Sequence, residues 1–363
     1  MKRLLFALLL LAAAGCDTAD PEVRLTTAQI VVGNQGNFTD NNGTVTFYDP
    51  ETGERTLDAV PGLGGLVQKL HLVGGRLYVL LNFSDSFATG RGRIAVVSPY
   101  TGEVQDEIAV STPRGLALVS AQRGYVTNLY AGTVTPVDFA AGMAGEPVEV
   151  GLNPEGIVAV GDRVYVGNGG FGFSSTVSVL DAGTGVVVET IDVGCDGPRS
   201  LLADGEGEVW VFCTGKTVFD PETFEVIERT DGAVVVLDGP TGAEVARFDV
   251  DDQLGTASFG DDAAYSVQQQ EAYVVEASTR VLRFDTATNT RSEALPRVVA
   301  EGASIGGIAY DDGADGLLVA TVPDDFVSSG SVLRLDRAGT VIEEVQVGLI
   351  PSTLAAFTVA GEK

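Results

Sequence analysis

Side chains suited to acid–base or metal chemistry are sparse in this sequence. The single histidine, His71, lies in a run of small and apolar residues, which indicates a core or channel position rather than a general base. Paired carboxylates recur, and the pair best placed for a cation is Asp324 and Asp325, in a predicted loop. The chain has no G-x-S-x-G nucleophile motif and no H-E-x-x-H zinc motif. We therefore predict a protein that is not an enzyme, and a metal-assisted hydrolase or lyase is the alternative.

The first of the three cysteines, Cys16, ends a predicted export signal. Lys2 and Arg3 precede an apolar stretch, and small residues lead directly into Cys16, a pattern that resembles a bacterial lipobox. We therefore predict a lipoprotein signal peptide over residues 1–15, with a lipidated Cys16 that begins a polar tether over residues 16–24. A soluble secreted protein cleaved just before Cys16 is the alternative.

The other two cysteines, Cys195 and Cys213, form an even pair in a chain predicted to be exported. A disulfide is the expected state of such a pair outside the cytoplasm. No histidine lies near either residue in the sequence, and two thiolates are too few ligands for a structural metal site. The sequence therefore predicts a disulfide between Cys195 and Cys213.

Aromatic residues and asparagines gather in the variable segments between predicted strands. Loop aromatics that cluster indicate a binding surface, because loops carry function while the scaffold stays fixed. The asparagines recur at strand ends, where capping of the strand is the alternative role. The predicted ligand contacts are Asn34, Phe38, Asn82, Phe83, Phe87, Asn128, Tyr130, Asn168, Phe171, Phe173 and Phe326.

Charge narrows the classes of partner. Lys and Arg number 22 against 50 Asp and Glu, which gives a formal net charge of −28. Such a surface repels nucleic acid and anionic lipid headgroups. We therefore predict no nucleic-acid partner, and attachment to the membrane through the lipid anchor alone.

A repeated phrase organises the elements that position these residues. The clearest copy, TVSVLDAGTG from Thr176, is a short alternating strand that ends on an aspartate and a glycine-containing turn. Seven copies recur every 40 to 57 residues, a period typical of propeller blades. Their turn positions, where the side chain accepts backbone N–H groups, are Asp49, Ser98, Asp138, Asp181, Asp238, Asp285 and Asp336.

Two further strands precede each copy, a small-residue strand and a Tyr-Val strand, so the unit is a four-stranded meander. The chain enters the pattern at a second strand, residues 28–34, and ends on an unpartnered first strand, residues 351–359. Together these two strands complete a blade and remove the open sheet edge. The prediction is an all-β, seven-bladed propeller over residues 25–360, with the ring closed by the C-terminal strand joining the N-terminal blade.

The phrases PRGLALV, VYVGN and TVSVLDAGTG resemble those of the YncE-like family of seven-bladed propellers. With the lipobox, the resemblance implies a cell-surface lipoprotein of the outer membrane. Some members of this group resemble capture proteins that sit over TonB-dependent transporters, including cobamide-binding ones. We expect no cofactor, because quinone-cofactor propellers are rich in tryptophan and this chain has only Trp210.

Fold and residues together predict a non-catalytic cell-envelope lipoprotein. The loop face, from which the variable loops and the connections between blades emerge, is expected to bind a small ligand or a transporter partner. A third hypothesis is a surface scaffold without a small ligand, and a flat loop face would favour it.

Overall fold

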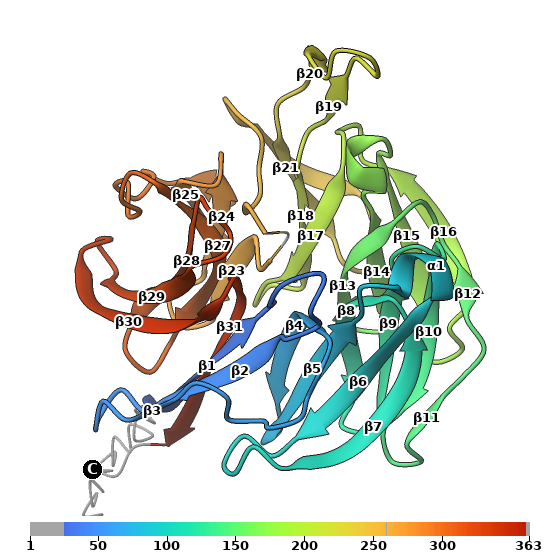
Figure 1. The fold of residues 1–363 in the computed structure, drawn as a ribbon. Helices are drawn as coiled ribbons and strands as arrows, with labels where there is room; N and C mark the ends of the chain where they lie inside the picture. Colours follow the sequence, from blue (N-terminus) through green and yellow to red (C-terminus); the bar gives the residue numbers. More distant parts are fainter. Residues whose placement is uncertain (1–24, 259, 361–363) are drawn as a thin grey trace, which may run out of the picture.

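A computed structural model describes residues 25–258 and 260–360, which form seven antiparallel sheets arranged as blades around a common centre, together with one two-stranded sheet (Figure 1). The predicted seven-bladed β-propeller is confirmed. The first strand of every blade contacts the first strands of both neighbouring blades, so the ring is closed. These inner strands are β4 (Leu66–Val73), β8 (Pro113–Ser120), β13 (Pro154–Val160), β17 (Pro198–Ala203), β23 (Ala263–Ser266), β27 (Ala303–Asp311) and β31 (Pro351–Ala360).

The remaining strands of each blade follow outward from the channel. The second strands are β1 (Leu25–Asn34), β5 (Arg76–Asn82), β9 (Arg123–Asn128), β14 (Arg163–Asn168), β18 (Glu208–Cys213), β24 (Glu271–Glu276) and β28 (Gly316–Pro323). The third strands are β2 (Thr44–Tyr48), β6 (Arg91–Val97), β10 (Thr133–Asp138), β15 (Thr176–Asp181), β21 (Ala233–Asp238), β25 (Arg280–Asp285) and β29 (Ser329–Asp336). The outer strands are β3 (Arg55–Thr56), β7 (Val104–Ser111), the short pair β11 (Met143–Ala144) and β12 (Val148–Glu149), β16 (Val187–Asp192), β22 (Glu244–Asp249), β26 (Thr290–Arg291) and β30 (Val341–Leu349).

In five of the seven blades, an aromatic residue at the third position of the second strand fills the space between blades. Each of these side chains is less than 2% exposed, and each is among the largest fully buried residues of the described chain. A buried phenol or indole needs a polar partner. The Tyr165 hydroxyl donates to the Gly239 carbonyl at 2.7 Å, and the Trp210 indole donates to Asp204 Oδ2 at 2.9 Å. The set is Tyr78, Tyr125, Tyr165, Trp210 and Tyr273.

The ring closes at the pairing of the two ends of the described chain. Strand β31 runs antiparallel to β1, with a register from Leu25 opposite Ala360 to Asn34 opposite Pro351. The blade therefore has the order β3-β2-β1-β31, with the C-terminal strand innermost (Figure 1). This is the predicted closure, and it leaves no inner strand without neighbours.

The aspartates of the repeated phrase stabilise the turns between third and fourth strands. Asp49 Oδ1 accepts from the amides of Glu51 and Thr52, and Asp181 Oδ1 accepts from the amide of Thr184. Hydrogen bonds from Thr52 and from Thr184, respectively, hold the pKa of each carboxyl below its usual value. The markers are therefore turn residues, as the sequence predicts.

The longest variable loop contains a hairpin that the sequence analysis did not identify. Strands β19 (Thr217–Phe219) and β20 (Val226–Arg229) pair with each other and stand beyond the ring, between β18 and β21 (Figure 1). Asp220 accepts from the amides of Glu222 and Thr223, so the turn repeats the geometry of the blade turns. The letters DPET at Asp220 match those at Asp49 and carried the missed signal.

The predicted signal peptide, Cys16 and the whole predicted tether lie outside the described residues. Within the described ranges, no helix combines the length and the apolar character needed to cross a membrane. The one α-helix described there, α1, is the short segment Ser86–Thr89, and a 3-10 turn spans Gly170–Gly172.

Candidate functional site

The central channel holds a cavity of about 300 Å³ lined by the beginnings of the inner strands. Four of these strands begin with proline, and in three of them the next residue is charged. Arg114, Glu155 and Arg199 occupy this position in β8, β13 and β17, and all three line the cavity. Ring geometry therefore gathers side chains that are some 40 residues apart in the sequence into one polar site.

Opposite charges pair across the blades around this cavity. Arg114 Nη2 lies 3.0 Å from Glu155 Oε2, and Arg199 Nη2 lies 2.6 Å from Asp262 Oδ1. Lys69 and Asp261, which also line the cavity, form a third pair. Their Nζ and Oδ1 atoms are 2.6 Å apart. The three cations and three carboxylates balance, so the channel mouth is strongly polar without a net charge.

Among the three carboxylates around this cavity, only that of Glu155 has an oxygen that accepts no hydrogen bond from the described residues. Its side chain is buried, with 7% of the residue exposed, and Oε2 receives the Arg114 guanidinium. Oε1 is also buried, and no donor among the described residues reaches it. A buried charged oxygen without a hydrogen bond is unfavourable by about 1–3 kcal/mol or more. A ligand hydroxyl or water at this oxygen would remove that cost.

His71 lines the same channel from β4, in agreement with its predicted core or channel position. Burial and the nearby Lys69 ammonium lower its pKa to about 3. The imidazole is therefore neutral at physiological pH, and its buried Nε2 contacts no hydrogen-bond partner among the described residues.

A larger cavity, about 640 Å³, opens beside the channel beneath the β19–β20 hairpin. It shares Glu155 and Arg199 with the channel cavity, and Phe171 and Phe219 contribute exposed rings. Gln253 Nε2 donates to Lys216 O at 2.9 Å and to Thr230 O at 3.2 Å, which fixes the base of the hairpin. This cavity therefore combines a rigid polar floor with an aromatic rim.

A third cavity, about 270 Å³, collects most of the predicted aromatic contacts. The Phe87 and Tyr130 rings meet edge to face, with centroids 5.1 Å apart, and the Arg91 guanidinium lies 3.9 Å from the centroid of Phe83. The predicted residues that line it are Phe38, Asn82, Phe83, Phe87, Tyr130 and Phe171. Gln68 and Arg114 also line it and connect it to the channel cavity.

The two other predicted aromatics do not join these cavities. Phe173 is 59% exposed and Phe326 is 42% exposed, and neither lines any of the three cavities. Phe173 lies two residues from Phe171, which borders both outer cavities. The pair therefore offers one contact residue and one matched control on the same loop.

Three of the four predicted asparagines are structural. Asn34, Asn128 and Asn168 are 0% exposed, and each side-chain amide donates to two hydroxyls of the neighbouring third strand. The acceptors are Thr44 and Thr46 for Asn34, Thr133 and Thr135 for Asn128, and Thr176 and Ser178 for Asn168. This clamp corrects their placement among the ligand contacts and leaves Asn82 as the only asparagine of the four at a cavity.

The acidic pair predicted as a cation site is a turn instead. Asp325 Oδ1 accepts from the amides of Val327 and Ser328, and Oδ2 accepts from the Ser328 hydroxyl at 2.6 Å. These bonds hold the pKa of Asp325 below its usual value. Residues 25–258 and 260–360 contain no group of three or more His, Cys, Asp or Glu side chains that could hold a metal ion.

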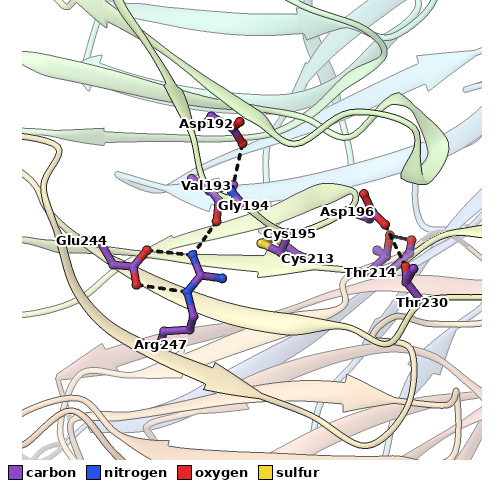
Figure 2. Close-up of a disulfide and its surroundings, with 11 residues drawn as sticks. Asp192, Val193, Gly194, Cys195, Asp196, Cys213, Thr214, Thr230, Glu244 and Arg247 are labelled. Atoms are coloured by element: carbon purple, nitrogen blue, oxygen red, sulfur yellow. Dashed lines mark hydrogen bonds and ion pairs between the residues drawn. A yellow bond between two sulfur atoms is a disulfide. The ribbon is translucent and has the colours of Figure 1, made fainter.

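Cys195 and Cys213 are joined by a disulfide (Figure 2). It connects the loop before β17 to the end of β18, from which the β19–β20 hairpin departs. Thr230 Oγ1 donates to Asp196 Oδ2 at 2.9 Å, beside the disulfide (Figure 2). Gly197, Thr214 and Gly215, within two residues of the cysteines, line the cavity, so the disulfide holds its wall.

Replacing both cysteines, Cys195→Ala and Cys213→Ala, is expected to lower the free energy of unfolding by about 3 kcal/mol, the chain-entropy value for a loop of this length. Urea denaturation of both proteins measures the difference. Wild type in excess dithiothreitol, which breaks the disulfide, should unfold at the same lowered urea concentration as the variant. Equal midpoints for wild type, reduced wild type and variant would contradict a stabilising disulfide.

The described fold defines a seven-bladed β-propeller, and known structures share it at low sequence identity. A quinonprotein alcohol dehydrogenase-like protein from Bacteroides thetaiotaomicron matches with a TM-score of 0.68 and 14% identity, covering 91% of this chain and 78% of its own. The periplasmic gluconolactonase of Pseudomonas aeruginosa matches with 0.65 and 16%, covering 93% and 99%. Hydrazine synthase of Kuenenia stuttgartiensis matches with 0.61 and 18%, covering 84% and 97%. No family model and no curated protein matches the sequence.

These comparisons contradict the prediction that the chain is not an enzyme. Two of the three proteins carry the names of enzymes, a gluconolactonase and a hydrazine synthase. The lack of serine-hydrolase and zinc motifs therefore does not exclude catalysis on this fold. At these identities the likeness shows the fold and assigns no activity to this chain.

Proposed function

We propose that the protein binds a small molecule on its loop face, at the mouth of the central channel. The observation that carries the proposal is the continuity of the three cavities. The channel cavity shares Glu155 and Arg199 with the larger one and shares Gln68 and Arg114 with the aromatic one. Phe171 borders both outer cavities. A hollowed face with a few polar groups and exposed rings is typical of ligand sites.

The proposal extends to a cell-envelope lipoprotein held at the outer membrane by lipid on Cys16. The lipobox-like residues and the resemblance to YncE-like surface lipoproteins support it, and the latter also implies a TonB-dependent transporter as partner. Expression with radiolabelled palmitate tests the anchor. Label on the wild type and none on Cys16→Ala would support lipidation. An unlabelled wild type would contradict the proposed lipid anchor.

A second candidate, a hydrolase or lyase, uses the same cavity. It is supported by three carboxylates, those of Glu155, Asp261 and Asp262, that line the same cavity. Of the three carboxylates, Glu155 is the best candidate for a general base. One of its oxygens accepts no hydrogen bond from the described residues and is available to a substrate proton. Nuclear magnetic resonance of each bound ligand over hours, with and without protein, separates turnover from capture.

A thermal-shift screen of the mature domain from Asp20 onward is the direct test of binding. A ligand at 100 times its dissociation constant adds about 2.7 kcal/mol of stability. We expect Phe171→Ala to abolish the ligand-induced shift, because Phe171 borders both outer cavities, while Phe173→Ala retains it. Equal responses from the two variants would place binding elsewhere. No shift across cobamides, haem, siderophores and sugars would favour a scaffold that binds protein.

A further inference from the structure

We infer that the ligand of this site is a neutral polyhydroxylated ring compound, a carbohydrate, seated in the larger cavity where it joins the channel. The inference rests on the proposed binding function and adds the chemical class of the ligand. Three properties of the cavity support it: its balanced charges, its unused acceptor and its exposed aromatic rings.

The charges at the cavity are already compensated. Arg199 makes a bidentate contact with Asp262, with Nε–Oδ2 and Nη2–Oδ1 distances of 2.7 and 2.6 Å. Arg229, the other cation of the cavity, pairs with Asp252. An ionic ligand would therefore have to break an existing pair or enter without a partner. A neutral ligand meets no such cost.

The remaining acceptor selects a hydroxyl donor. Glu155 Oε1 is buried and receives no hydrogen bond from the described residues, and Glu155 borders both the channel and the larger cavity. An ammonium group would also donate to this oxygen. It would approach the guanidinium of Arg114, which lies 3.0 Å from Glu155 Oε2, and that of Arg199, and both repel cations. A hydroxyl donates to the oxygen without that repulsion.

The apolar part of the cavity fits the ring faces of a sugar. Phe171 and Phe219 line the cavity with 48% and 54% of their surfaces exposed. The C–H faces of a pyranose are apolar, and its edge carries hydroxyls. The aromatic rings of the cavity can therefore pack against a face of the sugar while the carboxylate accepts from a hydroxyl at its edge. The volume, about 640 Å³, lies in the usual range for small-molecule sites.

Isothermal titration calorimetry on the mature, disulfide-bonded chain tests the inference. The neutral probes are D-glucose and maltose, and the charged probes of similar shape are D-gluconate and D-glucosamine. We expect a neutral probe to bind more tightly than either charged probe. Glu155→Gln should weaken that binding about tenfold or more, because it replaces a charged carboxylate acceptor with a neutral amide that has one acceptor oxygen.

Two matched controls keep the result interpretable. Glu343 also pairs with an arginine, Arg334, but lies on the outer strand β30, so Glu343→Gln should leave sugar binding unchanged. Because Glu155→Gln also alters a buried pair, Phe219→Ala gives independent evidence. Phe219→Ala should weaken binding, whereas Phe224→Ala, on the same hairpin and outside the cavities, should not.

Tighter binding of a charged probe would overturn the inference, as would sugar binding that is insensitive to both Glu155→Gln and Phe219→Ala. No heat from either neutral sugar at 100 mM would overturn it as well. The proposed function survives those results if another ligand still gives a shift that Phe171→Ala removes. It fails if no small molecule does so, which separates the two failures.

Discussion

Removal of β31 is expected to abolish the cooperative unfolding transition of the propeller. This strand pairs with β1 along nearly its whole length and contacts β27 and β4 on either side. The Thr353 hydroxyl accepts from the Leu70 amide at 3.0 Å, and the Leu354 amide donates to Asp261 at 3.0 Å. Its loss opens the ring at three blades. The stabilising free energy that these contacts contribute is expected to exceed the total stability of a typical domain, about 5–15 kcal/mol.

Calorimetry of a chain that ends at residue 350 measures this effect. A chain that ends at Ala360 is the control and should retain the full transition. A synthetic peptide of residues 351–360 added to the truncated chain should restore part of the transition, because the empty position is a pre-formed sheet edge. A truncated chain with the melting temperature of the control would show that closure is dispensable.

The ring could be predicted because its information is local and repeated. Alternating strands recur in every blade, a turn aspartate recurs in six of the seven and an aromatic residue of the second strand in five, and each copy reinforces the others. The pairing of the first and last strands could be predicted because the chain begins with a second strand and ends with a first strand, and together they complete the seventh blade. The third blade's divided outer strand, β11 and β12, could not be predicted in the same way, because its residues are exposed and carry no alternation.

The channel charges could not be predicted by the same means. Four inner strands, β4, β8, β13 and β17, contribute one such residue each, and Arg114 or Arg199 alone is indistinguishable from a surface arginine. Only the closed ring shows that Arg199 meets Asp262, 63 positions later, in a buried pair. The available signal was positional, a charged residue directly after the proline that begins three inner strands.

The asparagines show a signal that was present and not used. Asn34, Asn128 and Asn168 face third strands that begin with two hydroxyl residues separated by one position, as in Thr44-Val45-Thr46. Asn82 faces Gly92 instead, in a strand that begins Arg91-Gly92-Arg93 and offers no hydroxyl. The clamp is therefore absent from this blade, which leaves Asn82 to line the aromatic cavity.

Replacing Asp262 with alanine is expected to lower the free energy of unfolding by about 3–5 kcal/mol, the usual cost of removing one member of a buried ion pair. The Asp262 side chain is 4% exposed and accepts both Arg199 bonds. It also accepts from the Ser200 hydroxyl at 2.9 Å and from the Thr256 amide at 2.8 Å. The variant leaves the Arg199 guanidinium buried without its carboxylate. Urea denaturation at pH 7 measures the loss.

The pH dependence distinguishes loss of this charge from loss of packing. Burial alone would raise the pKa of Asp262, but the Arg199 guanidinium and the hydrogen bonds hold it below its usual value. A carboxyl with a lowered native pKa stabilises the fold above its unfolded pKa, about 3.9, and loses that contribution as pH falls through the native value. The gap between wild type and Asp262→Ala should therefore narrow below about pH 4. A constant gap down to pH 2 would assign the loss to packing.

A double variant completes the test of the pair. Arg199→Met with Asp262→Leu removes both charges and fills the space with apolar side chains, so it should be more stable than Asp262→Ala alone. Arg199→Met and Asp262→Leu are also made singly, and if the double variant is destabilised by the sum of these two effects, the two side chains act independently and the ion pair does not join the blades. If it recovers stability and also loses ligand binding, the pair serves the channel mouth more than the fold, because Arg199 borders both the channel and the larger cavity.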